Sequence, residues 1–166
     1  MGLLCARLPL STDQDIIEAV ESAFADVSRP AHFTNYLHCD ECAEHDQTLL
    51  QHDRDSLRVG CVNNPGWDPI CFCSPQGKAY YIPALVRFAL EDSNGSTHPY
   101  WQQLLFHLEA DGPKNVLIEF CSAHQRQAIA MFLEHLIVSR ASAVEKFGST
   151  EEALRTYGYW ATAPKS

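Results

Sequence analysis

Histidines and cysteines gather in one short stretch of the sequence, His32-x5-His38-Cys39-x2-Cys42-x2-His45. Zinc is bound by about four nitrogen or sulfur ligands in a tetrahedron, and a C-x2-C pair supplies two thiolates at a spacing that a tight turn or helix start brings to one ion. On a helix, positions three apart differ by about 60° in direction, so Cys39, Cys42 and His45 would share a face. His32 or His38 would complete the set from the preceding loop. The sequence therefore predicts a candidate zinc site at Cys39, Cys42, His45 and His38.

Two other interpretations account for the same residues. A single C-x2-C motif, without a second one at the distance found in zinc ribbons, occurs often by chance. Cys39 and Cys42 would then be small buried residues, and His45 a histidine with a hydrogen-bonded partner. A cysteine beside a histidine could also act as a nucleophile, but no Gly-rich elbow surrounds either cysteine. His107 could reach the site as a remote ligand, whereas Cys71, in an apolar C-x-C run, points to the core.

Motifs of the common enzyme classes are missing. The sequence has no P-loop, no dinucleotide-binding fingerprint and no G-x-S-x-G elbow. Glu41 and Glu44 are expected on the exposed face of a helix. We therefore interpret them as solvated charges rather than as a catalytic acid and base pair. We therefore expect a protein that acts by binding. A metal at four protein ligands would be structural, and hydrolysis would require an open position with water.

The charge of the 166-residue chain is unevenly distributed. Twelve Lys and Arg stand against 21 Asp and Glu, for a net charge of −9, and residues 11–55 hold eleven of the acids against only Arg29 and Arg54. No basic cluster exists that would bind nucleic acid. This pattern predicts one acidic face, which either keeps the protein soluble or docks a basic protein partner.

The residues expected to contact such a partner combine acidic side chains with one tryptophan. Partly exposed Tyr and Trp are favoured at protein interfaces, although large rings also cover helix ends in any α-rich fold. The candidate partner-binding residues are Asp40, Glu41, Glu44, Asp46, Asp53, Asp55 and Trp67.

Apolar residues at helical spacing predict a mainly α fold, a single compact domain over residues 1–166 with at most a small β element. Capping boxes at Ser11 with Gln14, Ser122 with Gln125 and Ser149 with Glu152 mark three helix starts. The expected helices cover residues 11–28, 40–52, 83–90, 98–108, 122–137 and 149–158. Residues 114–120 could form a short strand, and residues 67–72 a short strand or a buried loop.

The chain carries no signal for a membrane or for secretion. No stretch approaches the roughly 20 apolar residues of a bilayer span, and the apolar run in residues 1–10 is too short for a secretory h-region and has its charge in the wrong place. Seven cysteines are an odd number, which favours reduced thiols over a disulfide framework. We expect a cytoplasmic protein.

Three motifs resemble an uncharacterised bacterial family of unknown function: H-C-D-E-C-A-E-H-D at residues 38–46, N-P-G-W-D-P-I-C-F at 64–72 and Y-Y-I-P-A at 80–84. The resemblance covers roughly residues 29–140 and implies a bacterial origin without an activity. The Y-Y-x-P-A motif with its later Gln-opened helix is also loosely similar to bacterial immunity proteins. The localised negative charge and the missing catalytic motifs lead to the hypothesis of an acidic inhibitor of a secreted toxin, such as a nuclease effector with a positive substrate channel. The alternative is a zinc-binding protein or metal-dependent enzyme built on Cys39, Cys42 and His45.

Overall fold

The predicted mainly α fold is confirmed. The structure is a computed structural model that describes residues 11–91 and 96–162. The described residues form eight α-helices: α1 (Asp13–Ala23), α2 (Asp40–Leu50), α3 (Pro75–Glu91), α4 (Tyr100–Glu109), α5 (Val116–Phe120), α6 (Ala123–Ser139), α7 (Ala141–Lys146) and α8 (Thr150–Ala161). Three 3-10 helices join them: η1 (Val59–Cys61), η2 (Pro69–Phe72) and η3 (Gly112–Lys114). Over the same ranges the only β element is an isolated antiparallel bridge between Thr34 and Cys73.

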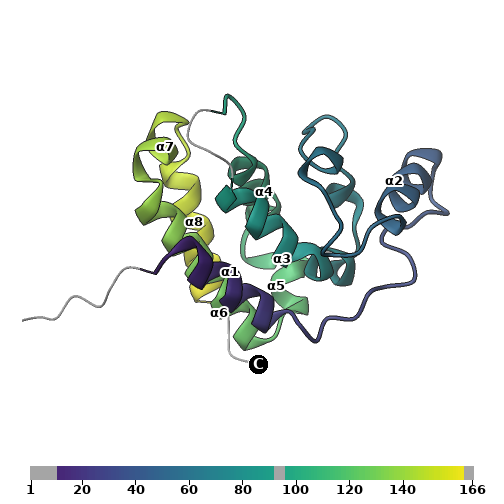
Figure 1. Cartoon of the computed structure of the whole chain (residues 1–166), viewed down its shortest axis with the longest axis horizontal. Coiled ribbons are helices and arrows are strands. Elements are labelled where there is room, and N and C mark those ends of the chain that lie inside the picture. The colour runs from purple at the N-terminus through teal and green to yellow at the C-terminus, as the bar shows by residue number, and fades with distance from the viewer. Residues whose placement is uncertain (1–10, 92–95, 163–166) are drawn as a thin grey trace, which may run out of the picture.

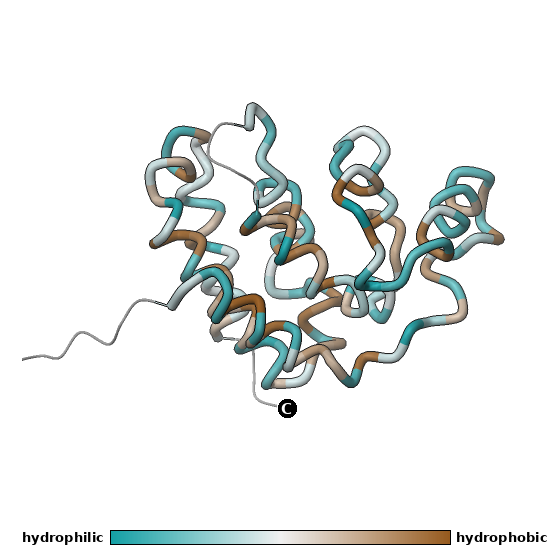
Figure 2. Tube along the Cα trace, in the orientation of Figure 1, coloured by the Kyte–Doolittle hydropathy of each residue, from teal (hydrophilic) through white to brown (hydrophobic). Residues whose placement is uncertain are grey.

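Most helices pack around a shared apolar core (Figure 1). Helix α6 packs against α1, α7 and α8, while α3 packs against α1, α4 and α5. Fully buried side chains from several of these helices, including Tyr81, Leu104, Phe132 and Trp160, fill the space between them. Helix α2 lies at one end of the molecule, where it packs on η2, and Figure 2 shows that hydrophilic residues dominate it. No described helix is long and apolar enough to cross a membrane, and the chain start, where no secretory signal is predicted, lies outside the described residues.

The predicted capping boxes are partly right. The box at Ser122 and Gln125 is present and opens α6. The first box lies one residue later than predicted, because Thr12 caps α1 and exchanges hydrogen bonds with Asp15. The third is wrong: Ser149 makes no side-chain cap, and α8 continues past Gly158 to Ala161.

Helix α3 begins two turns earlier than the expected start near Pro83. Pro75 stands at its first position, where a missing N–H costs nothing, and the Ser74 hydroxyl accepts a hydrogen bond from Gly77 N–H at 3.1 Å. Pro83 lies inside the helix, where proline costs about 3 kcal/mol. Both of its neighbours, Ile82 and Ala84, are buried, so tertiary packing outweighs this local preference.

Neither segment that could form a short strand does so, and residues 67–72, for which a buried loop was the alternative, contain a 3-10 helix with Pro69 and Ile70 buried. Asp68 accepts a hydrogen bond from Ile70 N–H at 2.9 Å and so starts η2, in which Pro69 holds the first position. Asn115 caps α5 by accepting from Leu117 N–H at 2.8 Å, in the segment expected as a strand at residues 114–120. In both places a side chain that bonds to the nearby backbone favours a helical turn over an extended chain.

Candidate metal centre

The start of α2 places two thiols side by side. Cys39 is the N-cap residue, with extended backbone angles, and its Sγ accepts from Cys42 N–H at 3.4 Å. Cys42 follows one turn later and is buried, whereas Cys39 is exposed. The helix start thus fixes the direction of both cysteine side chains.

The preceding loop is held against α2 by Asp46. Its carboxylate accepts from the backbone N–H groups of Phe33 at 2.6 Å and Thr34 at 3.0 Å. The Thr34 hydroxyl donates to the Cys42 carbonyl at 2.7 Å. Asp46 also contacts His32 Nδ1 at 2.7 Å. These bonds fix the path of the loop that carries His38 to the helix start.

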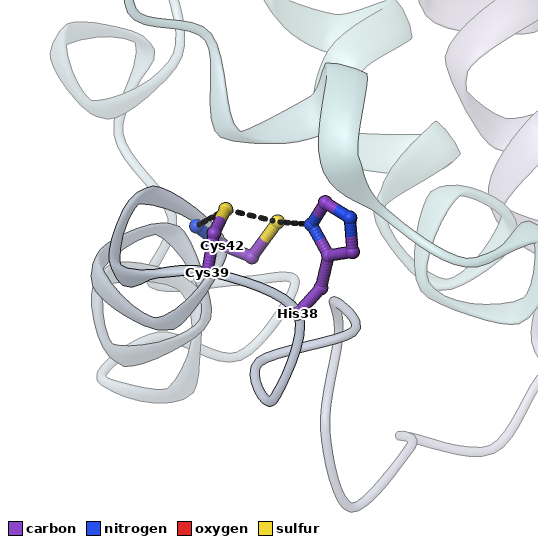
Figure 3. A group of neighbouring side chains, drawn as sticks. All are labelled: His38, Cys39 and Cys42. Carbon is purple, nitrogen blue, oxygen red and sulfur yellow. Dashed lines mark hydrogen bonds between the residues drawn. The ribbon is translucent and has the colours of Figure 1, made fainter.

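His38, Cys39 and Cys42 converge, as Figure 3 shows. The two sulfur atoms are 3.2 Å apart, His38 Nδ1 is 3.8 Å from Cys42 Sγ, and all three ligand atoms lie within 4.8 Å of one another. Tetrahedral zinc, with bonds of about 2.3 Å to sulfur and about 2.05 Å to nitrogen, requires separations of about 3.8 Å between sulfurs and about 3.6 Å between sulfur and nitrogen. The two sulfurs would have to move apart by about 0.6 Å, and Cys42 Sγ and His38 Nδ1 would have to approach by about 0.2 Å, to reach that geometry.

The two thiols differ in acidity. Hydrogen bonds from the Cys42 N–H and the Cys42 thiol, together with the neighbouring His38, lower the pKa of Cys39. The hydrogen bond to Cys39 and burial raise the pKa of Cys42. Without metal, the first thiolate therefore forms at the exposed sulfur. A bound cation would favour deprotonation of both.

His45 was predicted as a ligand and does not join this group. It is fully buried, with its ring 4.5 Å from the Phe72 ring and 4.6 Å from the Trp67 ring. Successive three-residue steps accumulate about 120° between positions 39 and 45, which turns His45 toward η2. Within the described part of the chain neither ring nitrogen makes a hydrogen bond, and Nε2 lies 3.7 Å from Glu41 Oε1.

The site has three protein ligands within the described part of the chain. Over residues 11–91 and 96–162, no further His, Cys, Asp or Glu completes this cluster, and His32, the other candidate, is stacked on Tyr36 and bonded to Asp46. His38 and Cys39 are exposed. A tetrahedral ion held by these three residues would have one coordination position left, on the side of the exposed His38 and Cys39.

A second group, Asp68, Cys71 and His107, was not predicted from the sequence as a site. His107 could have reached the site on α2 as a remote ligand, but its Nε2 instead lies 2.7 Å from Asp68 Oδ2. Because nearly 40 positions separate these two residues, no local spacing could reveal the pair. The one local pattern at Asp68 was the Asp-Pro pair at residues 68–69, which indicates the start of a turn but not a metal site.

The predicted acidic face is divided. Asp40, Glu41, Glu44, Asp53, Asp55 and Trp67 are exposed, but Asp46, also predicted to face a partner, is only 2% exposed because it caps the loop backbone. On α1, Asp13 bonds to Arg140 and Glu21 pairs with Arg87. Figure 1 shows α1 packed beside the other helices and α2 at one end of the molecule, so the acids of α1 and those of α2 lie on separate parts of the fold.

Comparison of the chain with models of protein families, with curated proteins and with solved structures finds no match. The resemblance of its motifs to a bacterial family therefore stays a prediction.

Proposed function

We propose that this protein binds one zinc ion through the Cys39 and Cys42 thiolates and His38 Nδ1, with one coordination position open to solvent. The observation that carries the proposal is the convergence of these three ligand atoms within 4.8 Å at the start of α2. Thiolate and imidazole ligands favour zinc over magnesium and calcium, which prefer oxygen. Zinc bound there would act as a Lewis acid toward a ligand in the open position.

The surroundings of the three ligands support this assignment. The Cys42 N–H donates to Cys39 Sγ, and Asp46 and Thr34 fix the loop against α2. Outer contacts of this kind orient metal ligands and are worth about 10- to 100-fold in affinity. The same contacts hold the ligands close together before any ion binds.

Metal analysis tests the zinc proposal. The wild-type chain should bind one zinc per chain, and Cys39→Ser and Cys42→Ser should each abolish stoichiometric binding. Cys61→Ser is a matched control, because Cys61 Sγ also lies near a histidine, 3.7 Å from His52 Nε2, but outside any three-ligand group. A wild-type protein that takes up no zinc when metal is added, or equal zinc in Cys39→Ser and Cys61→Ser, would refute the proposal.

A basic protein partner is a second candidate, favoured by the surface at the end of the molecule. Asp40, Glu41 and Glu44 are exposed on α2. The Trp67 side chain, which is 45% exposed, contacts the ring of His45 on that helix. In this candidate function, the partner would bind only the acidic residues of α2 and not all the acids of residues 11–55. A toxin bound by an immunity protein is one partner of that kind.

Charge reversal tests the second candidate. Changing Asp40, Glu41 and Glu44 to Lys should slow association with a basic partner at least about tenfold at low salt, because complementary charge speeds encounter. Changing Glu134, Glu145 and Glu151, exposed acids of α6, α7 and α8, alters net charge equally and should leave the rate nearly unchanged. Equal slowing by both triple variants would count against a docking surface on α2.

A further inference from the structure

The second group of ligand-type side chains lies between η2 and α4. Asp68 starts η2, Cys71 lies within it, and His107 comes from α4. One ligand atom from each of the three residues lies within 4.8 Å of the others. The group combines a carboxylate, a thiol and an imidazole, which are three of the donor types that bind zinc and related ions.

Two of the three ligands are deeply buried. Asp68 is 3% exposed and His107 is 4% exposed, and Asp68 Oδ2 lies 2.7 Å from His107 Nε2. Asp68 also accepts hydrogen bonds from Ile70 N–H and from the Gln103 side chain. A buried carboxylate held by several donors is typical of a fixed ligand that is oriented by its outer contacts.

A purely structural link between η2 and α4 would need only Asp68 and His107. It does not require the third donor, Cys71, which is exposed. Asp68 and Cys71 both line a cavity of about 410 Å³, together with Gln102, Gln103 and Phe106. The cavity would give an ion access to Asp68 and Cys71, with His107 directly behind Asp68, and it leaves room for a further ligand.

We propose that Asp68, Cys71 and His107 form a second metal site, which binds a divalent transition-metal ion of the zinc and cobalt class and faces this cavity. The Cys71 thiol loses one proton on binding. The imidazole binds the ion through Nε2 as the neutral tautomer, so the proton that Nε2 donates to Asp68 Oδ2 in the metal-free protein moves to Nδ1. The separation of Asp68 Oδ2 and His107 Nε2 must widen from 2.7 Å to about 3.4 Å for tetrahedral coordination.

Cobalt(II) is the probe for this site, because a cobalt–thiolate bond gives a charge-transfer absorption band. The titration is made in the Cys39→Ser/Cys42→Ser variant, so that the outcome is independent of the zinc site on α2. This variant should bind one cobalt per chain with a thiolate band and release about one proton. Addition of Cys71→Ala should remove the band and weaken binding at least about tenfold, while addition of Cys61→Ala should leave both unchanged.

Loss of cobalt binding in the Cys71→Ala variant would not result from unfolding, because Cys71 is exposed. Circular dichroism can verify that this variant remains helical. Absence of cobalt binding in the double variant would overturn the proposal. A thiolate band that survives Cys71→Ala would overturn it as well. Either result would leave the zinc site on α2 standing, since that site is tested by zinc content in separate variants.

Discussion

Replacement of Asp13 by Asn should destabilise the fold at neutral pH. The Asp13 carboxylate accepts from Arg140 Nη1 at 2.6 Å and Nη2 at 2.7 Å, and it lies 2.7 Å from His135 Nε2. Arg140 also donates to the Leu90 carbonyl at 2.9 Å. One carboxylate therefore joins the start of α1 to the ends of α3 and α6.

The pKa of Asp13 gives the magnitude. The hydrogen bond from Arg140, supported by His135, lowers this pKa from 3.8 to about 2. Such a shift corresponds to an upper limit of about 2.5 kcal/mol. Because the side chain is 43% exposed, solvent screening reduces the expected loss in the free energy of unfolding to about 1 kcal/mol.

The dependence on pH follows from the direction of the shift. A lowered pKa in the folded state contributes stability above pH 3.8, and this contribution is lost as the pH falls through about 2. Urea unfolding followed by circular dichroism should show the difference between wild type and Asp13→Asn at pH 7 and its disappearance near pH 2. The exposed Asp55, changed to Asn, is the control. A difference that persists unchanged at pH 2 would refute this reasoning.

Three further outcomes are expected. In metal-free protein, the pH at which alkylation reaches half its maximal rate should be lower for Cys39 than for Cys71. A backbone N–H donates to the Cys39 sulfur, whereas partial desolvation of the Cys71 sulfur, with the nearby Asp68, raises the pKa of Cys71 even though the residue is exposed. Mass spectrometry of iodoacetamide adducts against pH measures both. His45→Phe should keep or raise the free energy of unfolding and leave zinc content unchanged. The reason is that this buried ring stacks on aromatic rings and makes no hydrogen bond with the described residues that the substitution would remove. Denaturant titration and metal analysis test this prediction, and loss of zinc would contradict it. Gly77→Ala should lower the free energy of unfolding by about 1 kcal/mol. The new Cβ would lie 3.2 Å from both Cδ1 and the carbonyl oxygen of the fully buried Phe33. A thermal melt with an unchanged or higher midpoint would contradict this prediction and show that Phe33 can move aside.

Local patterns predicted much of the fold, because they act through contacts within a few residues. The apolar spacing of residues 16–27 and the box at Ser122 both indicate a helix without reference to the rest of the chain. The extension of α3 to Pro75 could not be predicted this way, because it depends on the burial of Pro83 among distant side chains. Residues 114–120 were interpreted as a possible strand because of their apolar run. The interpretation overlooked Asn115, whose side chain caps α5.

The same division applies to the site. His38, Cys39 and Cys42 are close in sequence, and the turn that joins them is local, so their convergence could be anticipated. His45 was misplaced because the helix rotates it toward Phe72. Asp68 and His107 meet only through the packing of η2 and α4, which single-sequence spacing does not encode.

The position of α2 at the margin of the bundle has a thermodynamic consequence. Its main packing partner among the helices is η2, and its last turn is tied to the rest by the Tyr81 hydroxyl, which donates to the Leu49 carbonyl at 2.8 Å. A helix that lies at the end of the molecule can open as a subglobal unit while α3 and α6 stay folded, and its amide hydrogens would then exchange earlier than theirs. A zinc ion held at its first turn would protect those amides, so local order and metal occupancy would form one linked equilibrium. The free metal concentration would thereby set the fraction of molecules in which this end of the protein is formed.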